Sequence, residues 1–170
     1  SIPLLADFKN GLQEINERLS DSPSKSNWDL LEYEAKRKTW YHDQTKTHLS
    51  AVGNIRPQAV MDAINQIVTQ DDLVVCDASL ASGWASAFLK LPKSGNCFIA
   101  PRGLATLGWG SPAAIGASMA MSRNQRIFHF AGDGGFSYSI QELESMARLN
   151  LPIITIIFNN STLGWIKHIQ

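Results

Sequence analysis

The sequence predicts an α/β protein: a three-layer α/β/α domain with a mostly parallel sheet, preceded by a helical linker segment. A short, uninterrupted apolar run at residues 73–76 is typical of a strand buried on both faces, and residues 152–158 read as another strand. Stretches with apolar residues at helical spacing alternate with such runs. This alternation implies right-handed crossovers between parallel strands, with helices covering the sheet.

The composition changes near residue 50. Residues 1–50 are polar and charged, and they predict one helix over about 8–19 and another over about 28–43. Residues 51–170 are apolar and rich in glycine. We therefore expect residues 1–50 to be a connecting segment that packs on a neighbouring domain, and residues 51–170 to form the domain with its own core.

The elements expected in residues 51–170 follow in order along the chain. Pro57 suits the first turn of a helix, and Ser111 with Pro112 predicts another helix with serine as its cap. Ser139 and Glu142 fit a capping box, and the residues expected to face inward after it are Ile140, Leu143, Met146 and Ala147. The remaining expected elements are strands at 73–76, 97–99, 127–131 and 152–158 and a helix at about 82–89.

Bulk properties exclude several classes of protein. The 170 residues are 44% hydrophobic and carry 15 basic and 15 acidic side chains. This balance gives no electrostatic reason to expect a nucleic acid or an anionic membrane as partner. No apolar run approaches the roughly 20 residues of a membrane span, and the N-terminus does not resemble a signal peptide. Cys76 and Cys97 lie in predicted strands, which favours buried free thiols over a disulfide. We expect a cytoplasmic protein.

Two loops that follow strands carry chemistry. Gly132-Asp133-Gly134-Gly135 comes directly after one strand, and Asn159-Asn160 comes after the next. Taken singly, the first loop can be a tight turn with a solvated aspartate, and the second a pair of asparagines that stabilise a turn.

Together, the two loops predict a site. Consecutive strands joined by a right-handed crossover lie side by side or nearly so, which brings Asp133 and Asn160 to one crevice. One carboxylate and one neutral oxygen suit Mg²⁺ that arrives with phosphate oxygens. The amides of Gly134 and Gly135 can bind phosphate at the start of a helix. The residues themselves therefore predict a Mg²⁺-bridged diphosphate.

This pattern of Gly-Asp-Gly, a helix, a strand and Asn-Asn resembles the signature of thiamine diphosphate (ThDP)-dependent enzymes. The loop and helix at residues 101–116 resemble the pyrimidine-binding loop of the acetolactate synthase-like branch. The segments that follow each motif, Gln141-Glu142-Leu143 and Leu163-Gly164-Trp165, are similar too. The resemblance runs from about residue 54 to the C-terminus, and residues 1–20 resemble the end of the family's middle domain.

The resemblance implies roles for particular residues. Asp133, Asn160 and the carbonyl of Thr162 would bind Mg²⁺, and the amides of Gly134 and Gly135 would bind the diphosphate. Leu107 would press the cofactor into a bent shape, and the carbonyl of Ala105, where many relatives have glycine, would accept a hydrogen bond from its amino group. Ser79 and Ala81 would lie in a loop that touches the diphosphate. Relatives often have Gln-His where this chain has Leu80-Ala81, so a contact there must use backbone amides or the hydroxyls of Ser79 and Ser82.

The resemblance also implies a reaction and partners. The activity would be decarboxylation of a 2-keto acid such as pyruvate, followed by addition to a second carbonyl compound. The activating glutamate would lie on a pyrimidine-binding domain of the same or a neighbouring chain, so no catalytic residue is expected here. We expect a truncated domain that is inactive alone, and a homodimer or tetramer for the complete enzyme, with FAD as a further possible cofactor.

Other functions stay open. Trp165-Ile166-Lys167 resembles pyruvate oxidases, and a decarboxylase or another ThDP lyase or hydrolase fits the same motifs. A non-catalytic binding or assembly subunit would keep the fold without the site. A nicotinamide-binding Rossmann domain is disfavoured because Gly103, Gly108 and Gly110 do not form Gly-x-Gly-x-x-Gly. The histidines lack zinc spacing, and we expect His129 to be structural.

Overall fold

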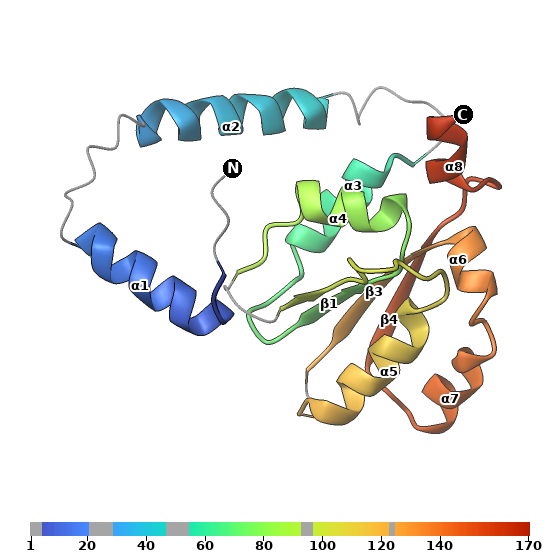
Figure 1. Cartoon of the computed structure of the whole chain (residues 1–170). Coiled ribbons are helices and arrows are strands. Elements are labelled where there is room, and N and C mark those ends of the chain that lie inside the picture. The colour runs from blue at the N-terminus through green and yellow to red at the C-terminus, as the bar shows by residue number, and fades with distance from the viewer. Residues whose placement is uncertain (1–4, 21–28, 47–54, 93–96, 123–124) are drawn as a thin grey trace. The chain divides into compact units, whose positions relative to one another are not determined.

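The computed structural model describes residues 5–20, 29–46, 55–92, 97–122 and 125–170 (Figure 1). The chain forms two compact units, Ser1–Trp40 and Tyr41–Gln170. The division falls earlier than the composition change near residue 50, because the Tyr41 hydroxyl bonds to Asp62 (2.7 Å) and to the carbonyl of Phe88 (3.2 Å) in the second unit. The assignment of residues 1–50 and 51–170 to separate domains stays a prediction.

The first unit contains helix α1 (Phe8–Ser20) and most of helix α2 (Leu30–Lys46), close to the helices predicted there. Asp7 caps α1 by accepting a hydrogen bond from the amide of Lys9 (3.1 Å). The sequence places Leu12, Ile15 and Leu19 of α1 at helical spacing, and all three side chains are exposed. The sequence also has a short strand-like run at residues 2–5, which lies mostly outside the described residues.

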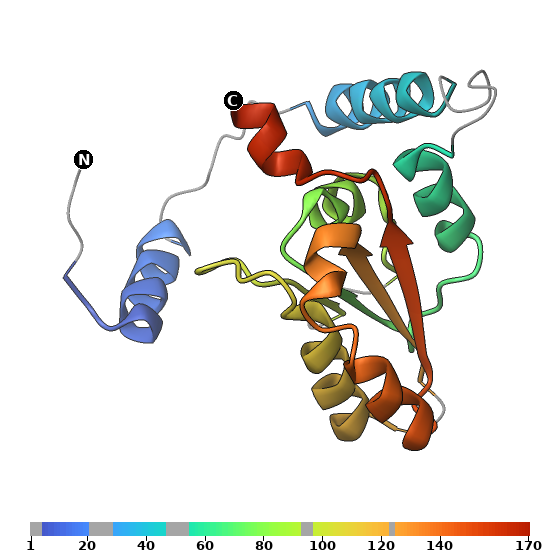
Figure 2. The same ribbon diagram turned by 90° about the vertical axis from the view of Figure 1, so that its right-hand side faces the viewer.

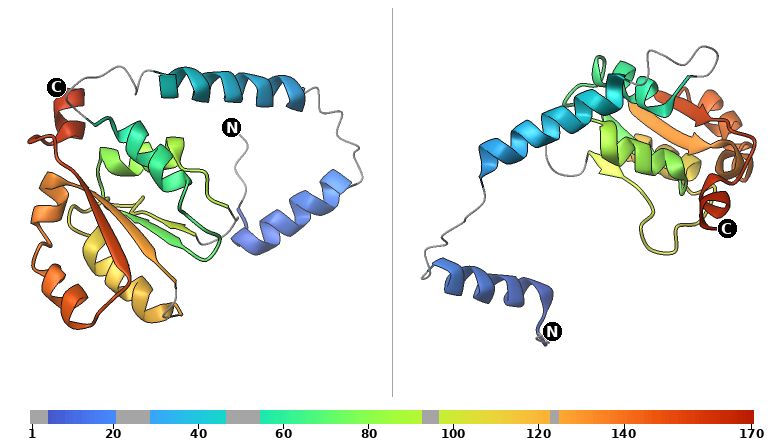
Figure 3. Two further views of the ribbon diagram at one scale, coloured as in Figure 1. Left: turned by 180° about the vertical axis from the view of Figure 1, so that it is seen from behind. Right: turned by 90° about the horizontal axis from the view of Figure 1, so that it is seen from above.

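The second unit is built on a sheet of four parallel strands in the order β2-β1-β3-β4. Figure 2 shows the layers, and Figure 3 shows from behind that β4 lies beside β3 at one side of the sheet. The α/β fold with a parallel sheet is confirmed. The strands are β1 (Leu73–Cys76), β2 (Phe98–Ile99), β3 (Ile127–Gly132) and β4 (Ile153–Phe158).

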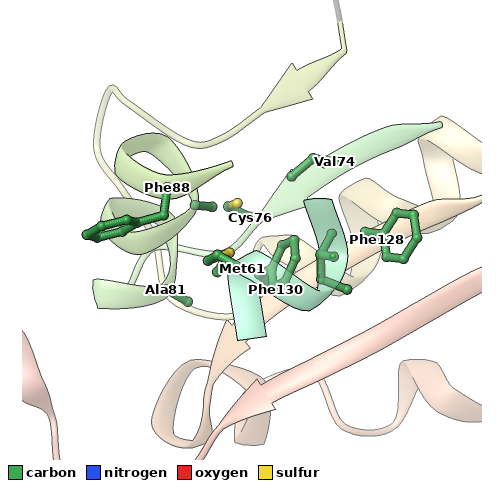
Figure 4. Close-up of a cluster of buried hydrophobic side chains, with 9 residues drawn as sticks. Met61, Val74, Cys76, Ala81, Phe88, Phe128 and Phe130 are labelled. Carbon is green, nitrogen blue, oxygen red and sulfur yellow. The ribbon is translucent and has the colours of Figure 1, made fainter. Parts of the chain in front are cut away.

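Helices cover both faces of this sheet. Helices α3 (Pro57–Asn65) and α4 (Leu80–Phe88) bury Met61 and Phe88 against one face, which contributes Cys76, Phe128 and Phe130 (Figure 4). Helix α5 (Gly110–Ala120) places Ala114 against Val75 and Ile127 on the other face. Because alternate residues of β1 and β3 face opposite layers, an almost wholly apolar strand is what this architecture requires.

Three short helices complete the unit. Helices α6 (Asp133–Ser137) and α7 (Glu142–Arg148) join β3 to β4, and α8 (Gly164–Ile169) follows β4. None of the helices in the described part of the chain is long and apolar enough to cross a membrane. Cys76 and Cys97 are both buried and are not joined in a disulfide, as predicted.

Two predicted helix caps are wrong. The Ser139 hydroxyl does not cap α7 but donates to the Ser111 hydroxyl (2.9 Å), and both residues are buried. Helix α5 begins at Gly110, so Ser111 lies within the helix and is not its cap. Helix α4 begins at Leu80, earlier than predicted, because Ser79 caps it. Of the residues expected to face inward here, Met146 is buried, whereas Ile140, Leu143 and Ala147 are exposed.

Candidate cofactor-binding site

The site begins where β3 and β4 end. Gly132 and Phe158, the last residues of these neighbouring strands, are paired in register. Asp133 is the first residue of α6 and is half-buried, and Asn160 is exposed two residues beyond β4. The structure thus brings the carboxylate of Asp133 and the carboxamide of Asn160 to the same edge of the sheet, where parallel α/β domains bind their ligands.

Asparagine turns shape the loop after β4. Asn159 Oδ1 accepts a hydrogen bond from the amide of Ser161 (3.1 Å), and Asn160 Oδ1 accepts one from the amide of Thr162 (3.2 Å). Ser161 has a φ of 54°, which such a turn accommodates. An amide oxygen has two lone pairs, so Asn160 Oδ1 keeps one for a ligand. Thr162, whose carbonyl is a predicted metal ligand, lies in this turn.

Gly134 and Gly135 form the first turn of α6, where backbone amides have no partner within the helix. A Cβ on Gly134 would lie 2.6 Å from Cδ2 of Leu163, so the loop after β4 packs on this turn. A Cβ on Gly135 would overlap with Oδ2 of Asp77 and would lie 3.6 Å from Cδ2 of Leu107. A Cβ at either position would therefore meet a neighbouring side chain, the movable end of Leu163 at Gly134 and the carboxylate of Asp77 at Gly135.

The loop at residues 101–109 also reaches the Gly134-Gly135 turn. Ala105 and Gly108 have φ values of 53° and 78°, and the left-handed conformation of Ala105 fits the glycine that many relatives have there. Asp77, directly after β1, accepts hydrogen bonds from the amides of Gly108 (3.0 Å) and Gly110 (3.1 Å). Leu107 is half-buried between these anchored glycines and Gly135, whereas Ala105 is exposed.

The loop after Asp77 satisfies its own hydrogen bonds. Ser79 Oγ accepts from the amide of Ala81 (3.1 Å), and the Ser82 hydroxyl donates to the carbonyl of Ser79 (2.8 Å). Ala81 is buried, and its amide is already used as part of the α4 cap. Ser79 is half-buried, beside the position where a Cβ on Gly132 would lie (3.4 Å). Of the two predicted contacts in this loop, the Ser79 hydroxyl is the accessible one.

Two buried titratable groups lie beneath the site. Burial lowers the pKa of His129 to about 4, although the negative charge of Asp77 acts to raise it. Its Nδ1 lies 3.3 Å from the Thr155 hydroxyl, and its Nε2 has no hydrogen-bond partner. Burial also raises the pKa of the Cys76 thiol to about 12. A neutral imidazole agrees with the structural role predicted for His129.

Sequence reasoning missed Asp77. The prediction placed polar site residues after β3 and β4 and did not include Asp77, which follows β1. Asp77 is only 1% exposed, although a lone aspartate at the end of a buried strand is usually solvated. The available signal was that this aspartate directly follows an apolar strand, as Asp133 does.

The predicted oxygen ligands suit a metal ion that is also coordinated by a phosphate. Among the described residues, no group of three or more His, Cys, Asp and Glu side chains could hold a metal ion. Asp133, Asn160 and the Thr162 carbonyl instead offer one charge and two neutral oxygens. This set suits Mg²⁺ that is coordinated in part by phosphate and water.

The fold and these loops define a domain of the kind that binds a diphosphate at the ends of parallel strands. Residues 77–170 match the family described as the thiamine pyrophosphate enzyme, C-terminal TPP binding domain. The chain belongs to this family, in its acetolactate synthase-like branch.

Similar proteins agree with the family. The chain is 29% identical to the thiamine pyrophosphate-containing protein YdaP of Bacillus subtilis, over 98% of this chain and 28% of that protein. It is 28% identical to the acetolactate synthase large subunit of Lactococcus lactis, over 99% of this chain and 28% of that subunit. It is 31% identical to the pyruvate oxidase of Lactiplantibacillus plantarum, over 99% of this chain and 27% of that protein. The chain thus spans less than a third of the length of each of these three relatives.

A solved structure has the same fold. The ThDP-dependent 4-hydroxybenzoylformate decarboxylase of Rhodococcus jostii RHA1 matches with a TM-score of 0.63 and 26% identity, over 71% of this chain and 22% of that chain.

Proposed function

We propose that this domain binds ThDP through Mg²⁺ in an acetolactate synthase-like enzyme that decarboxylates 2-keto acids and joins the product to a second carbonyl compound. The observation that carries the proposal is the register of β3 and β4, which sets Asp133 and Asn160 at one edge of the sheet. Membership of the TPP-binding family supports ThDP as the diphosphate.

In this proposal, Mg²⁺ is held by the carboxylate of Asp133, the carboxamide oxygen of Asn160 and the carbonyl of Thr162. The first-turn amides of Gly134 and Gly135 would donate to the diphosphate, because the helix leaves them without internal partners. The hydroxyl of Ser79 would donate as well, while its oxygen continues to cap α4.

The loop at residues 101–109 would hold the other end of the cofactor. Leu107 would lie beneath the bend, and the left-handed Ala105 would present its carbonyl to the amino group. Bound ThDP supplies a carbanion that attacks a carbonyl carbon, and the protein supplies placement and electrostatics. The activating glutamate and the rest of the cofactor pocket would come from a pyrimidine-binding domain of the same chain or its partner in a homodimer or tetramer, so this domain alone would be inactive.

The test is turnover by the intact protein supplied with ThDP, Mg²⁺ and pyruvate. We expect release of carbon dioxide with formation of a carbon–carbon bond, detected as a hydroxy-keto acid product. The isolated 170-residue chain should release none. If the intact protein loaded with ThDP consumed no 2-keto acid of any size, the proposed reaction would be wrong, and a binding or assembly role would replace it.

A pyruvate oxidase is the second candidate. The relative named pyruvate oxidase is 31% identical, and the Trp165-Ile166-Lys167 that follows the Asn-Asn motif resembles pyruvate oxidases. Oxidation requires an electron acceptor, so this alternative predicts that turnover depends on FAD and consumes oxygen. The same assay, run with an oxygen electrode, separates the two reactions. A simple decarboxylase would release carbon dioxide with neither oxygen uptake nor a carboligation product.

A further inference from the structure

The strongest connection between the three loops of the site is the side chain of Asp77. Its carboxylate uses both oxygens: Oδ2 accepts from the amide of Gly108 (3.0 Å) and Oδ1 from the amide of Gly110 (3.1 Å). Asp77 itself is fixed to the sheet, since its amide donates to the carbonyl of Phe130 in β3 (2.8 Å). A carboxylate held at the end of β1 thus anchors the end of the 101–109 loop and the start of α5.

The two amides have little freedom to find other positions. Gly110 lies between Asp77 and His129, since a Cβ there would be 2.5 Å from the imidazole Nε2 and 2.9 Å from Cβ of Asp77. Gly108 is held on its other side by Tyr138, whose Cβ would be 2.7 Å from a Cβ on Gly108. The backbone on both sides of Trp109 is therefore packed against fixed groups while it donates to Asp77.

The same carboxylate contacts the diphosphate turn. Gly135 packs so closely on Oδ2 of Asp77 that a methyl group would overlap with it, and Leu107 Cδ2 lies at van der Waals distance from the same point. Asp77 therefore touches one residue predicted to bind the diphosphate and holds the residue next to Leu107.

We propose that Asp77 is a positioning residue that sets the distance between the 101–109 loop and the Gly134-Gly135 turn, and so the fit of the bent cofactor. Where it concerns the cofactor, this inference rests on the proposed function. Asp77 would act through Leu107 and Gly135 and need not touch the cofactor. Burial of the carboxylate favours this role, because a buried acceptor with two amide donors holds them more firmly than an exposed one.

The test compares Asp77→Asn with Asp72→Asn in the intact protein. Asp72 is a matched control: it lies just before β1 as Asp77 lies just after it, is also buried, and accepts from Arg126 (2.7 Å) far from the loop. In Asp77→Asn the amide group can accept only one of the two hydrogen bonds. Hydrogen exchange at Gly108 or Gly110 should become at least about tenfold faster in Asp77→Asn and stay unchanged in Asp72→Asn.

Ligand binding then separates positioning from general stability. In the presence of Mg²⁺, Asp77→Asn should weaken ThDP at least about tenfold but weaken inorganic pyrophosphate, which lacks the rings, less than about twofold. Equal losses for both ligands, or none for either, would overturn the positioning role. If the wild-type protein bound no ThDP, the proposed function would fail, while the exchange rates would still decide whether Asp77 anchors the loop.

If Asp77→Asn did not fold, hydrogen exchange in the wild-type protein would test the anchor. The wild-type amides of Gly108 and Gly110 should then exchange at least about 100-fold more slowly than those of Gly103 and Leu104, which belong to the exposed part of the same loop. Similar rates for all four amides would contradict the anchor.

Discussion

Gly135 packs directly on the carboxylate of Asp77, so a single methyl group at residue 135 would overlap with Oδ2. Gly134 differs, because the nearest atom to a Cβ there is Cδ2 at the end of the exposed Leu163 side chain, 2.6 Å away. Of these adjacent glycines, Gly135 therefore faces the fixed carboxylate of Asp77, and Gly134 faces the movable side chain of Leu163.

Gly135→Ala is expected to destabilise the domain by roughly 1–3 kcal/mol, since a buried hydrogen-bonded carboxylate must move. Gly134→Ala should cost clearly less, because Leu163 can adopt another rotamer. Urea unfolding of both variants measures the difference. Equal losses of stability would contradict the close contact between Gly135 and Asp77.

The domain should become less stable as the pH falls from the pKa of unfolded histidine to the pKa of folded His129. Its pKa is lowered to about 4 by burial, whereas an unfolded histidine titrates near about 6.5. Between these values the unfolded chain binds a proton that the folded chain does not, so the free energy of unfolding decreases from about pH 6.5 to about pH 4. The loss should be on the order of 3 kcal/mol.

Unfolding experiments across this pH range, on the wild type and on His129→Gln, test this expectation. The variant should lose this part of the pH dependence. His168→Gln, which removes an exposed imidazole of α8, is the control. A pH profile that is unchanged in His129→Gln would show that His129 does not titrate as its burial implies.

Neither cysteine should react with a thiol reagent while the domain is folded. Burial raises the pKa of Cys76 to about 12, so its thiolate is scarce at neutral pH, and Cys97 is also buried. Absorbance with Ellman's reagent should report both thiols only after denaturant is added. In Cys97→Ser, fast reaction of the one remaining thiol under native conditions would contradict the burial of Cys76.

Ala105→Gly should stabilise the domain or leave its stability unchanged, because Ala105 has a φ of 53° and is exposed. Relief of the left-handed strain, about 1 kcal/mol, offsets the greater freedom of glycine in the unfolded chain. The same substitution at Ala113 in α5 should cost about 1 kcal/mol, since it replaces alanine within a helix. If Ala105→Gly destabilised the domain as much as Ala113→Gly, the left-handed conformation would be wrong.

The sheet and the strand-end loops could be predicted because the strongest sequence signals coincide there. The apolar runs that became β1 and β3 suit strands covered by helices on both faces, and the loops after β3 and β4 carry the polar residues. Strand β4 is apolar too, but its Ile154 and Ile157 are exposed. Ser139 fitted a capping box, yet its hydroxyl bonds to Ser111, because tertiary burial of two hydroxyls prevailed over a local pattern. Asp77 was missed for a related reason: its partners, Gly108 and Gly110, are distant in the sequence, and no local spacing connects them.

The measurement that tests the central claim most directly is calorimetric titration of ThDP into the intact protein, with and without Mg²⁺. We expect binding that requires Mg²⁺ and that Asp133→Asn weakens by about 100-fold or more, equivalent to about 2.7 kcal/mol. Asp71→Asn, at an exposed carboxylate before β1, should bind ThDP as the wild type does. Binding that is indifferent to Mg²⁺ and to Asp133→Asn, or no binding by the wild-type protein, would contradict a Mg²⁺-bridged diphosphate site at the ends of β3 and β4.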